Sequence, residues 1–106
     1  MKVVRFHPQA EAEFGASVEY YEMREAGLGV DMEREVLRGM VEIRDAPHRW
    51  PVYGHGTRQY LLHRFPFRLV YLELPDALWI VAVAHCSRKP GYWKKRLGDA
   101  GPQMGR

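Results

Sequence analysis

The residues with the greatest chemical potential lie together near the C-terminal end, between positions 85 and 96. The stretch reads His85-Cys86-Ser87-Arg88-Lys89-Pro90-Gly91-Tyr92-Trp93-Lys94-Lys95-Arg96. Arginine and lysine can neutralise phosphates, and aromatic rings can stack on unpaired bases. A histidine or tyrosine can move a proton while a 2′-hydroxyl attacks its neighbouring phosphate. With a cation from the adjacent predicted strand, the pattern is typical of metal-independent RNA cleavage by Arg68, His85, Arg88 and Tyr92.

The same residues also have a structural interpretation, which the sequence leaves open. Tyr92 and Trp93 could cover the edge of the core, and His85 could be a hydrogen-bonded residue at a strand end. The cations at 94–96 could form a solvated helix face. Cys86, beside a strand that should be buried, is expected to be an inert small hydrophobe.

We expect neither a metal ion nor an organic cofactor. The five histidines show no ligand spacing, and the basic half of the chain would repel cations. Gly54-His55-Gly56 lacks the lysine and the following helix of a phosphate-binding loop. No partnered Cys–His or Ser–His–Asp arrangement is evident from the sequence.

Positive charge is concentrated in the second half of the chain. The net charge is +3, but residues 1–45 carry six Lys/Arg and ten Asp/Glu, which gives −4. Residues 46–106 carry ten Lys/Arg and three Asp/Glu, which gives +7. This asymmetry favours an anionic partner, namely RNA, DNA or an acidic protein segment, although an ordinary solvated basic face has the same composition.

Two amphipathic helices must precede this basic region. Apolar residues recur at spacings of four, four and three, which predicts a helix over 8–25 and a second one from 28 or 29 to 45. Their stripes are Ala10, Phe14, Val18 and Tyr21 in the first, and Met32, Val36, Met40 and Ile43, widened by Leu37 and Val41, in the second. The link between them is short, so they should form an antiparallel hairpin.

Strands flank the helices on both sides. Residues 2–6 predict a short strand, and 47–56 a loop in which Trp50 or Tyr53 could fold onto the core. Three strands follow, over 58–65, 67–74 and 77–85, as an antiparallel meander whose last member is apolar enough to be central. A short helical turn is expected within 90–97. The order β-α-α-β-β-β predicts an α+β fold, a helical hairpin packed on a small, mainly antiparallel sheet.

The chain has the size of one domain, which we place at 1–97. The tail 98–106 is small and polar and is predicted to be disordered. Cys86 is the only cysteine, so nothing suggests an oxidising compartment. The N-terminal apolar stretch is too short for a signal peptide, and no run is long enough to span a bilayer. We therefore expect a soluble, cytoplasmic protein.

Four segments, taken together, resemble the RelE/ParE-type toxins of bacterial type II toxin–antitoxin systems. They are Ala10…Glu13-Phe14…Tyr20-Tyr21 with Gly27-Leu28-Gly29, then Ile43…Pro47…Trp50-Pro51, then Arg58…Phe65-Pro66-Phe67-Arg68-Leu69-Val70-Tyr71, and finally Ala82-Val83-Ala84-His85…Arg88-Lys89-Pro90-Gly91-Tyr92-Trp93…Arg96. The resemblance covers residues 2–97 and rests on order and spacing. The Phe-Pro-Phe corner and the Pro-Gly-Tyr-Trp ending favour the ParE-like or "plasmid stabilisation" branch.

The resemblance implies a toxin that a cognate antitoxin neutralises by wrapping it with an acidic, helical C-terminal segment. Operator DNA would then be bound only through the antitoxin. In this family, ParE-like members poison DNA gyrase, whereas RelE-like members cut mRNA in the ribosome. Arg68 and Tyr92 match the strand arginine and the C-terminal tyrosine of those nucleases, and Arg88 lies where a further basic residue is common.

The sequence departs from the nuclease pattern at three positions. Gln59 and Leu61 replace a pair of lysines, and Cys86 replaces an arginine after the last strand. Three hypotheses follow: inhibition of gyrase, which we favour; ribosome-dependent mRNA cleavage; and an inactive relative that only binds an antitoxin. The partner should lie across the basic sheet face and strand edge. Its contact residues are predicted to be Arg58, Arg64, Trp93, Lys94, Lys95 and Arg96.

Overall fold

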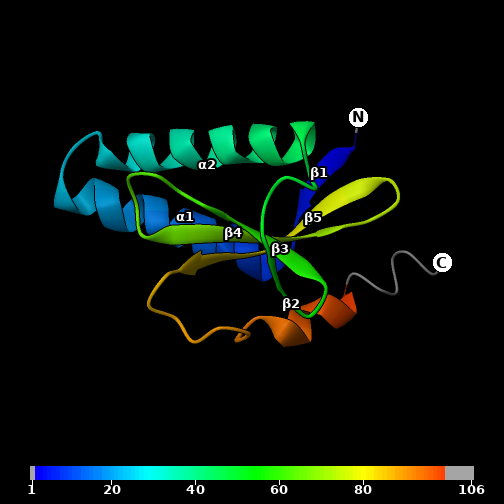
Figure 1. Cartoon of the computed structure of the whole chain (residues 1–106). Helices are drawn as coiled ribbons and strands as arrows, with labels where there is room; N and C mark the ends of the chain where they lie inside the picture. Colours follow the sequence, from blue (N-terminus) through cyan, green and yellow to red (C-terminus); the bar gives the residue numbers. More distant parts are fainter. Residues whose placement is uncertain (1, 100–106) are drawn as a thin grey trace.

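The computed structural model describes residues 2–99, as two helices and five strands (Figure 1). The elements are β1 (Val3–Phe6), α1 (Pro8–Arg24), α2 (Leu28–Asp45), β2 (Val52–Gly54), β3 (Thr57–Leu61), β4 (Phe67–Glu73), β5 (Ala77–His85) and the 3₁₀ turn η1 (Lys94–Arg96). Both helices and the last strand have the bounds that hydrophobic periodicity predicts, to within one residue.

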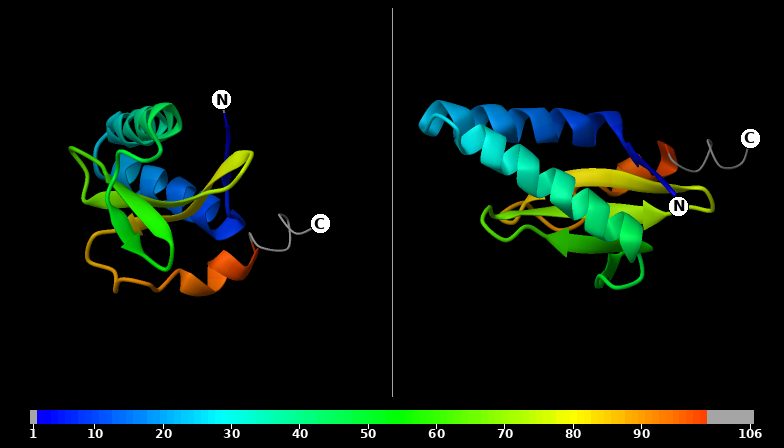
Figure 2. Two further views of the ribbon diagram at one scale, coloured as in Figure 1. Left: turned by 45° about the vertical axis from the view of Figure 1, so that its right-hand side comes forward. Right: turned by 90° about the horizontal axis from the view of Figure 1, so that it is seen from above.

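The five strands form one sheet in the order β1-β5-β4-β3-β2. Only β1 and β5 run parallel, and β3, β4 and β5 form the expected antiparallel meander. The helical hairpin covers one face of the sheet, and the segment after β5 crosses the other face (Figures 1 and 2). The predicted α+β fold class is therefore confirmed.

The sheet separates two hydrophobic clusters. The larger cluster joins the helices to the sheet, with Met32, Val36 and Ile43 of α2 packed against Tyr60, Leu69 and Ile80. The smaller cluster lies on the opposite face, where Trp93 packs against side chains of β4 and β5. The C-terminal segment thus completes the core, because without it this apolar sheet face would be exposed to water.

Two glycines of α2 allow the helices and the sheet to approach closely. A Cβ at Gly29 would lie 2.6 Å from the carbonyl oxygen of Val18, where α2 meets α1. A Cβ at Gly39 would lie 2.8 Å from a ring carbon of Tyr60, where α2 meets the sheet. Leu37 and Val41 were expected to widen the buried stripe, but they are 47% and 45% exposed, because no other described element packs over this side of α2.

Two further predictions about the strands were wrong. The strand expected over 58–65 ends at Leu61, since the carboxylate of Glu35 accepts the amides of His63 and Arg64 at 2.6 and 2.8 Å and holds them in a loop. The loop expected over 47–56 contains β2, which pairs with β3 through a tight turn at His55 and Gly56. Trp50 does pack against the larger cluster and Tyr53 against the smaller one.

The predicted tail lies outside the described residues from position 100 onward. Its first two residues, Gly98 and Asp99, continue the helical path after η1, and a carboxylate oxygen of Asp99 lies 2.5 Å from Nε2 of His7. His7 is the N-cap of α1, where its Nδ1 accepts the amide of Gln9. Among the described residues, no helix is both long and apolar enough to cross a membrane.

Candidate functional site

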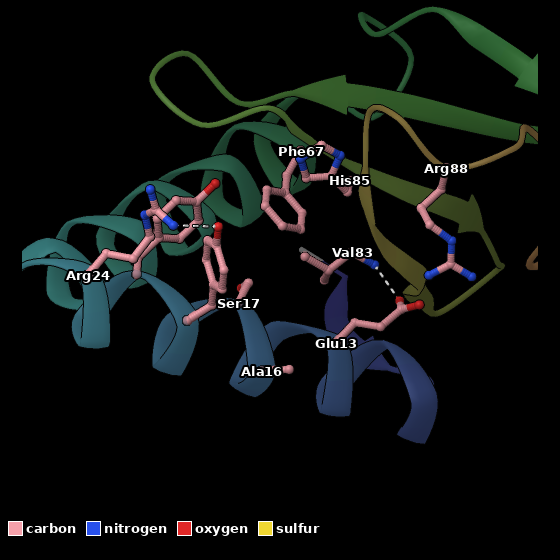
Figure 3. A pocket seen from close by; sticks show the side chains of 10 residues that line it. Glu13, Ala16, Ser17, Arg24, Phe67, Val83, His85 and Arg88 are labelled. Atoms are coloured by element: carbon pink, nitrogen blue, oxygen red, sulfur yellow. Dashed lines mark hydrogen bonds between the residues drawn. The ribbon is translucent and has the colours of Figure 1, made fainter.

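A groove of about 640 Å³, which we call the α1–β5 groove, opens between α1 and the C-terminal half of β5 (Figure 3). Phe67, Val83 and His85 form its sheet side, and Ala16 and Ser17 its helix side. Its remaining lining residues are Glu13, Tyr20, Tyr21, Arg24 and Arg88. Figure 3 shows Arg24 at one end of the groove and Arg88 at the other, where the Glu13 carboxylate also lies; the lining between them is mainly apolar.

The sheet side of this groove is an unpaired strand edge. β1 ends at Phe6, opposite Ile80, and beyond that point β5 has no strand neighbour on this side. The Val83 amide faces α1, so by strand alternation the Val83 carbonyl and the His85 amide face the same way. Neither has a hydrogen-bond partner among residues 2–99. The groove therefore offers a backbone acceptor and a backbone donor to a bound segment.

Glu13 closes the part of this edge nearest to β1. Its Oε1 accepts the Val83 amide at 3.0 Å and Nη1 of Arg96 at 2.9 Å. Its Oε2 accepts Nη2 of Arg96 at 2.9 Å and the Tyr92 hydroxyl at 2.8 Å. Arg96 also donates to the Val81 carbonyl at 3.1 Å. This bidentate pair therefore ties α1, β5 and the C-terminal segment together while satisfying edge groups that β1 leaves unpaired.

The Tyr92 hydroxyl gives this cluster a measurable pH dependence. Burial, and then the hydrogen bond to Glu13, raises the pKa of Tyr92. A raised folded-state pKa adds stability that is present below the unfolded value of about 10 and is lost as the pH rises above it. We expect the unfolding free energy of the wild type to fall more steeply than that of Tyr92→Phe between about pH 9 and 11 in urea titrations. Equal slopes would contradict this, because Tyr60 and Tyr71, whose pKa values are raised to about 12, are common to both proteins.

His85 points into the groove with a defined hydrogen-bonding role. Its Nδ1 accepts the amide of Ser87 at 3.0 Å and lies 2.7 Å from the Ser87 hydroxyl, a pairing that the sequence did not reveal. The neutral ring therefore carries its hydrogen on Nε2, which makes that nitrogen a donor. A donor at this position suits a carbonyl or carboxylate of a partner and does not suit removal of a proton from a hydroxyl.

The structure does not bring the four predicted catalytic residues together. Arg68 pairs with Ala84 in the sheet and Phe67 with His85, so Arg68 and His85 project from opposite faces. On the far face, Arg68 donates to Gln59 at 2.8 Å and its guanidinium lies 4.8 Å from the ring centre of Tyr53. The expectation that Arg68 reaches the same surface as His85 is therefore wrong, because adjacent positions on paired strands alternate between faces.

The other two members of that set do meet each other. The guanidinium of Arg88 lies 3.8 Å from the ring centre of Tyr92. However, the Tyr92 hydroxyl already donates to Glu13, and its raised pKa disfavours the phenolate. The arrangement therefore stacks a guanidinium on the ring and uses the phenol as a hydrogen-bond donor to Glu13.

The predicted contact residues divide into buried and exposed groups. Trp93 is 1% exposed and cannot contact a partner directly, because it fills the smaller cluster. Arg96 is held by Glu13, and Arg58 donates to the Trp50 carbonyl at 2.7 Å. Those that remain at the surface are Arg64, which lies 3.2 Å from Asp31, and Lys94 and Lys95. The basic sheet face proposed for the partner is itself covered by the C-terminal segment. Cys86 is exposed rather than a buried hydrophobe.

Sequence reasoning missed the helix side of the groove. Tyr20 is 54% exposed, and Arg24 stacks over its ring and donates to its hydroxyl at 3.0 Å. The sequence did contain a signal for this surface. Tyr20, Tyr21 and Met23 are close together on α1, and a stripe of helical period can bury only one of the three. Within residues 2–99, no three His, Cys, Asp or Glu side chains gather in a way that could hold a metal ion.

Comparison with known proteins gives a likeness in structure. No protein-family model matches the sequence, and no curated protein matches it. A solved chain described as "Chromosomal ParDE TA system from P. aeruginosa" superposes with a TM-score of 0.68. The match covers 80% of this chain and 96% of that chain at 16% sequence identity. At this identity the likeness establishes a shared fold.

Proposed function

We propose that this chain is the toxin of a type II toxin–antitoxin pair, of the ParE type, and acts in the cytoplasm. In this proposal a cognate antitoxin neutralises the chain, and the free chain arrests growth by inhibiting DNA gyrase. The observation that carries the proposal is the fold likeness to a chain of a ParDE system, which extends over 96% of that chain. The order and spacing of the sequence segments support the same family independently.

The geometry of the side chains supports gyrase inhibition over RNA cleavage. A metal-independent nuclease needs a cation, a proton acceptor and a proton donor around one phosphate. Here Arg68 and His85 project from opposite sheet faces, and the Tyr92 hydroxyl is engaged by Glu13. We therefore assign toxicity to binding rather than to cleavage.

The α1–β5 groove suits the neutralising segment. Its apolar walls can bury apolar side chains, and Arg24 and Arg88 at its ends can pair with carboxylates. The free backbone groups of Val83 and His85 can bond to the main chain of the same segment. An acidic, partly apolar segment of the antitoxin fits all three features. Operator DNA would be contacted only through the antitoxin.

Pulse labelling after induced expression in a bacterial host without the antitoxin tests the proposed target. We expect thymidine incorporation to fall within minutes, before methionine incorporation does, and co-expression of the protein encoded beside this gene to prevent the fall. An early fall in methionine incorporation would overturn gyrase inhibition in favour of mRNA cleavage. No growth defect at all would leave only antitoxin binding.

An Arg68→Ala variant separates the two chemistries further. Its side chain lies on the sheet surface, so its loss should leave the fold intact. If toxicity depends on binding elsewhere, the variant still arrests growth. If Arg68 neutralises a phosphate during cleavage, toxicity falls by orders of magnitude, roughly 100-fold or more.

A further inference from the structure

The segment that follows β5 carries positive charge only. The net charge of residues 86–98 is +5, because the segment has no acidic residue and five cations, namely Arg88, Lys89, Lys94, Lys95 and Arg96. Arg96 is paired with Glu13, and Arg88 lies at the end of the α1–β5 groove. The three lysines are exposed, and none of them forms a salt bridge with any of residues 2–99. We call these three side chains the lysine surface.

The lysine surface lies on a piece of chain that is held in place. The Tyr92 amide donates to the Lys89 carbonyl at 3.2 Å. The next turn follows at once, with the Lys94 amide bonded to the Gly91 carbonyl at 3.0 Å. Between them, the buried indole of Trp93 anchors the segment to the sheet. The three charges are therefore fixed to the core of the molecule rather than carried on a free tail.

The other side of the molecule has the opposite charge. α1 and α2 together carry nine acidic residues and four arginines, which gives −5. Both helices cover the face of the sheet that the C-terminal segment does not cover (Figure 2). A polyanion is therefore repelled by the helical side and attracted to the lysine surface, so the charge distribution selects one orientation of the chain on such a partner.

Neither apolar side chains nor free aromatic rings accompany these lysines. None of the large hydrophobic side chains that are exposed in the described part of the chain belongs to residues 86–98. Trp93 is buried, and the Tyr92 ring lies against the guanidinium groups of Arg88 and Arg96, at 3.8 and 5.2 Å. A protein interface has a largely apolar centre, and a single-stranded nucleic acid is held by rings on which its bases stack. The lysine surface offers neither, but exposed cations are what the phosphates of a duplex require.

We propose that the lysine surface binds the phosphate backbone of duplex DNA, whatever its base sequence. Phosphate contacts position a protein and carry no sequence information, so this binding is distinct from recognition of an operator. Its use by the toxin rests on the proposed function, because DNA gyrase works on duplex DNA and a chain held on the duplex meets its target there. The binding itself rests on the charges of this chain alone.

Fluorescence anisotropy of a labelled duplex of about 20 base pairs, titrated with the full chain, tests the proposal. With one phosphate for each lysine, a plot of log association constant against log salt concentration should have a slope of about −2.7. Binding should therefore weaken roughly 40-fold between about 50 and 200 mM salt. One strand of the same duplex should bind more weakly, because its charge density is lower and its bases find no ring to stack on.

Two pairs of exposed cations provide matched variants. Arg34 and Arg38 are exposed on α2 and, like the lysines, form no salt bridge within residues 2–99. Lys94→Gln/Lys95→Gln should make the slope shallower by about 2 and weaken binding at low salt about tenfold or more. Arg34→Gln/Arg38→Gln removes the same charge from the helical side and should leave the slope almost unchanged. Both double variants should retain the unfolding midpoint of the wild type, because all four side chains are exposed.

Four results would overturn the inference. The duplex could fail to bind even at about 50 mM salt, or the two double variants could lose the same affinity, which would mean that only net charge matters. Tighter binding of the single strand would assign the surface to unpaired nucleic acid. Loss of toxicity in Lys94→Gln/Lys95→Gln without any binding of the duplex would assign the lysines to a protein contact. The proposed function is tested separately, since growth arrest and its rescue are measured without added DNA.

Discussion

A Trp93→Ala variant is expected to lose about 3–5 kcal/mol of unfolding free energy and to melt more than about 10 °C below the wild type. The indole is 1% exposed and packs against Val70, Val81 and Ala84 on the face of the sheet opposite the helices. Its removal leaves a cavity between the C-terminal segment and the sheet. The rest of that segment is held chiefly by Glu13, so the smaller cluster would be open to water.

Thermal and urea unfolding of Trp93→Ala measure this effect, with Lys94→Ala and Lys95→Ala as neighbouring controls. The two lysines are exposed, so their truncation should change the unfolding free energy by less than about 0.5 kcal/mol. A Trp93→Ala protein of unchanged stability that bound its partner more weakly would show that Trp93 is a contact residue after all. Loss of stability identifies it as part of the core.

The second large effect concerns neutralisation. Ala16 lies on the helix side of the α1–β5 groove, and Arg24 stands at its end. The double variant Ala16→Glu/Arg24→Glu should weaken the complex with the antitoxin roughly 100-fold or more, because it places a carboxylate against an apolar segment and reverses a pairing charge. Both positions are exposed on α1, so the fold should be unaffected.

Arg49→Glu is the matched control for the charge change. Arg24 and Arg49 are both exposed, and each guanidinium lies over an aromatic ring, at 5.3 Å from Tyr20 and 5.4 Å from Trp50. Calorimetric titration with the antitoxin should give a clear loss for Arg24→Glu and almost none for Arg49→Glu. Equal losses would indicate that only net charge matters, and undiminished affinity in the double variant would remove the groove from the interface.

A small chain can bind its neutralising partner and its target through different surfaces. The α1–β5 groove lies beside the helical hairpin and presents a free strand edge, whereas Arg68, Tyr53 and Leu61 lie on the far face of the sheet. If the partner occupies this groove, neutralisation need not involve residues of the far face. Variants of the far face alone can then show whether the target contacts that face.

The two helices, β5 and the fold class could be predicted from the amino-acid sequence alone. Helical periods fixed α1 and α2, and an almost unbroken apolar run fixed β5, since those patterns depend only on which residues must be buried along one element. The fold class followed from their order.

Tertiary structure decided which side chains meet. Arg68 and His85 are close on paired strands but project from opposite faces of the sheet. The reason is the register of β4 against β5, which pairs Arg68 with Ala84 and not with His85. Glu13 meets Tyr92 and Arg96 across about 80 residues of sequence, and Glu35 ends β3 from the middle of α2. Long-range pairs of this kind leave no periodic trace. The same holds for Leu37, Val41 and Trp93, whose exposure depends on what packs over each element, and one chain's pattern of apolar residues does not specify that.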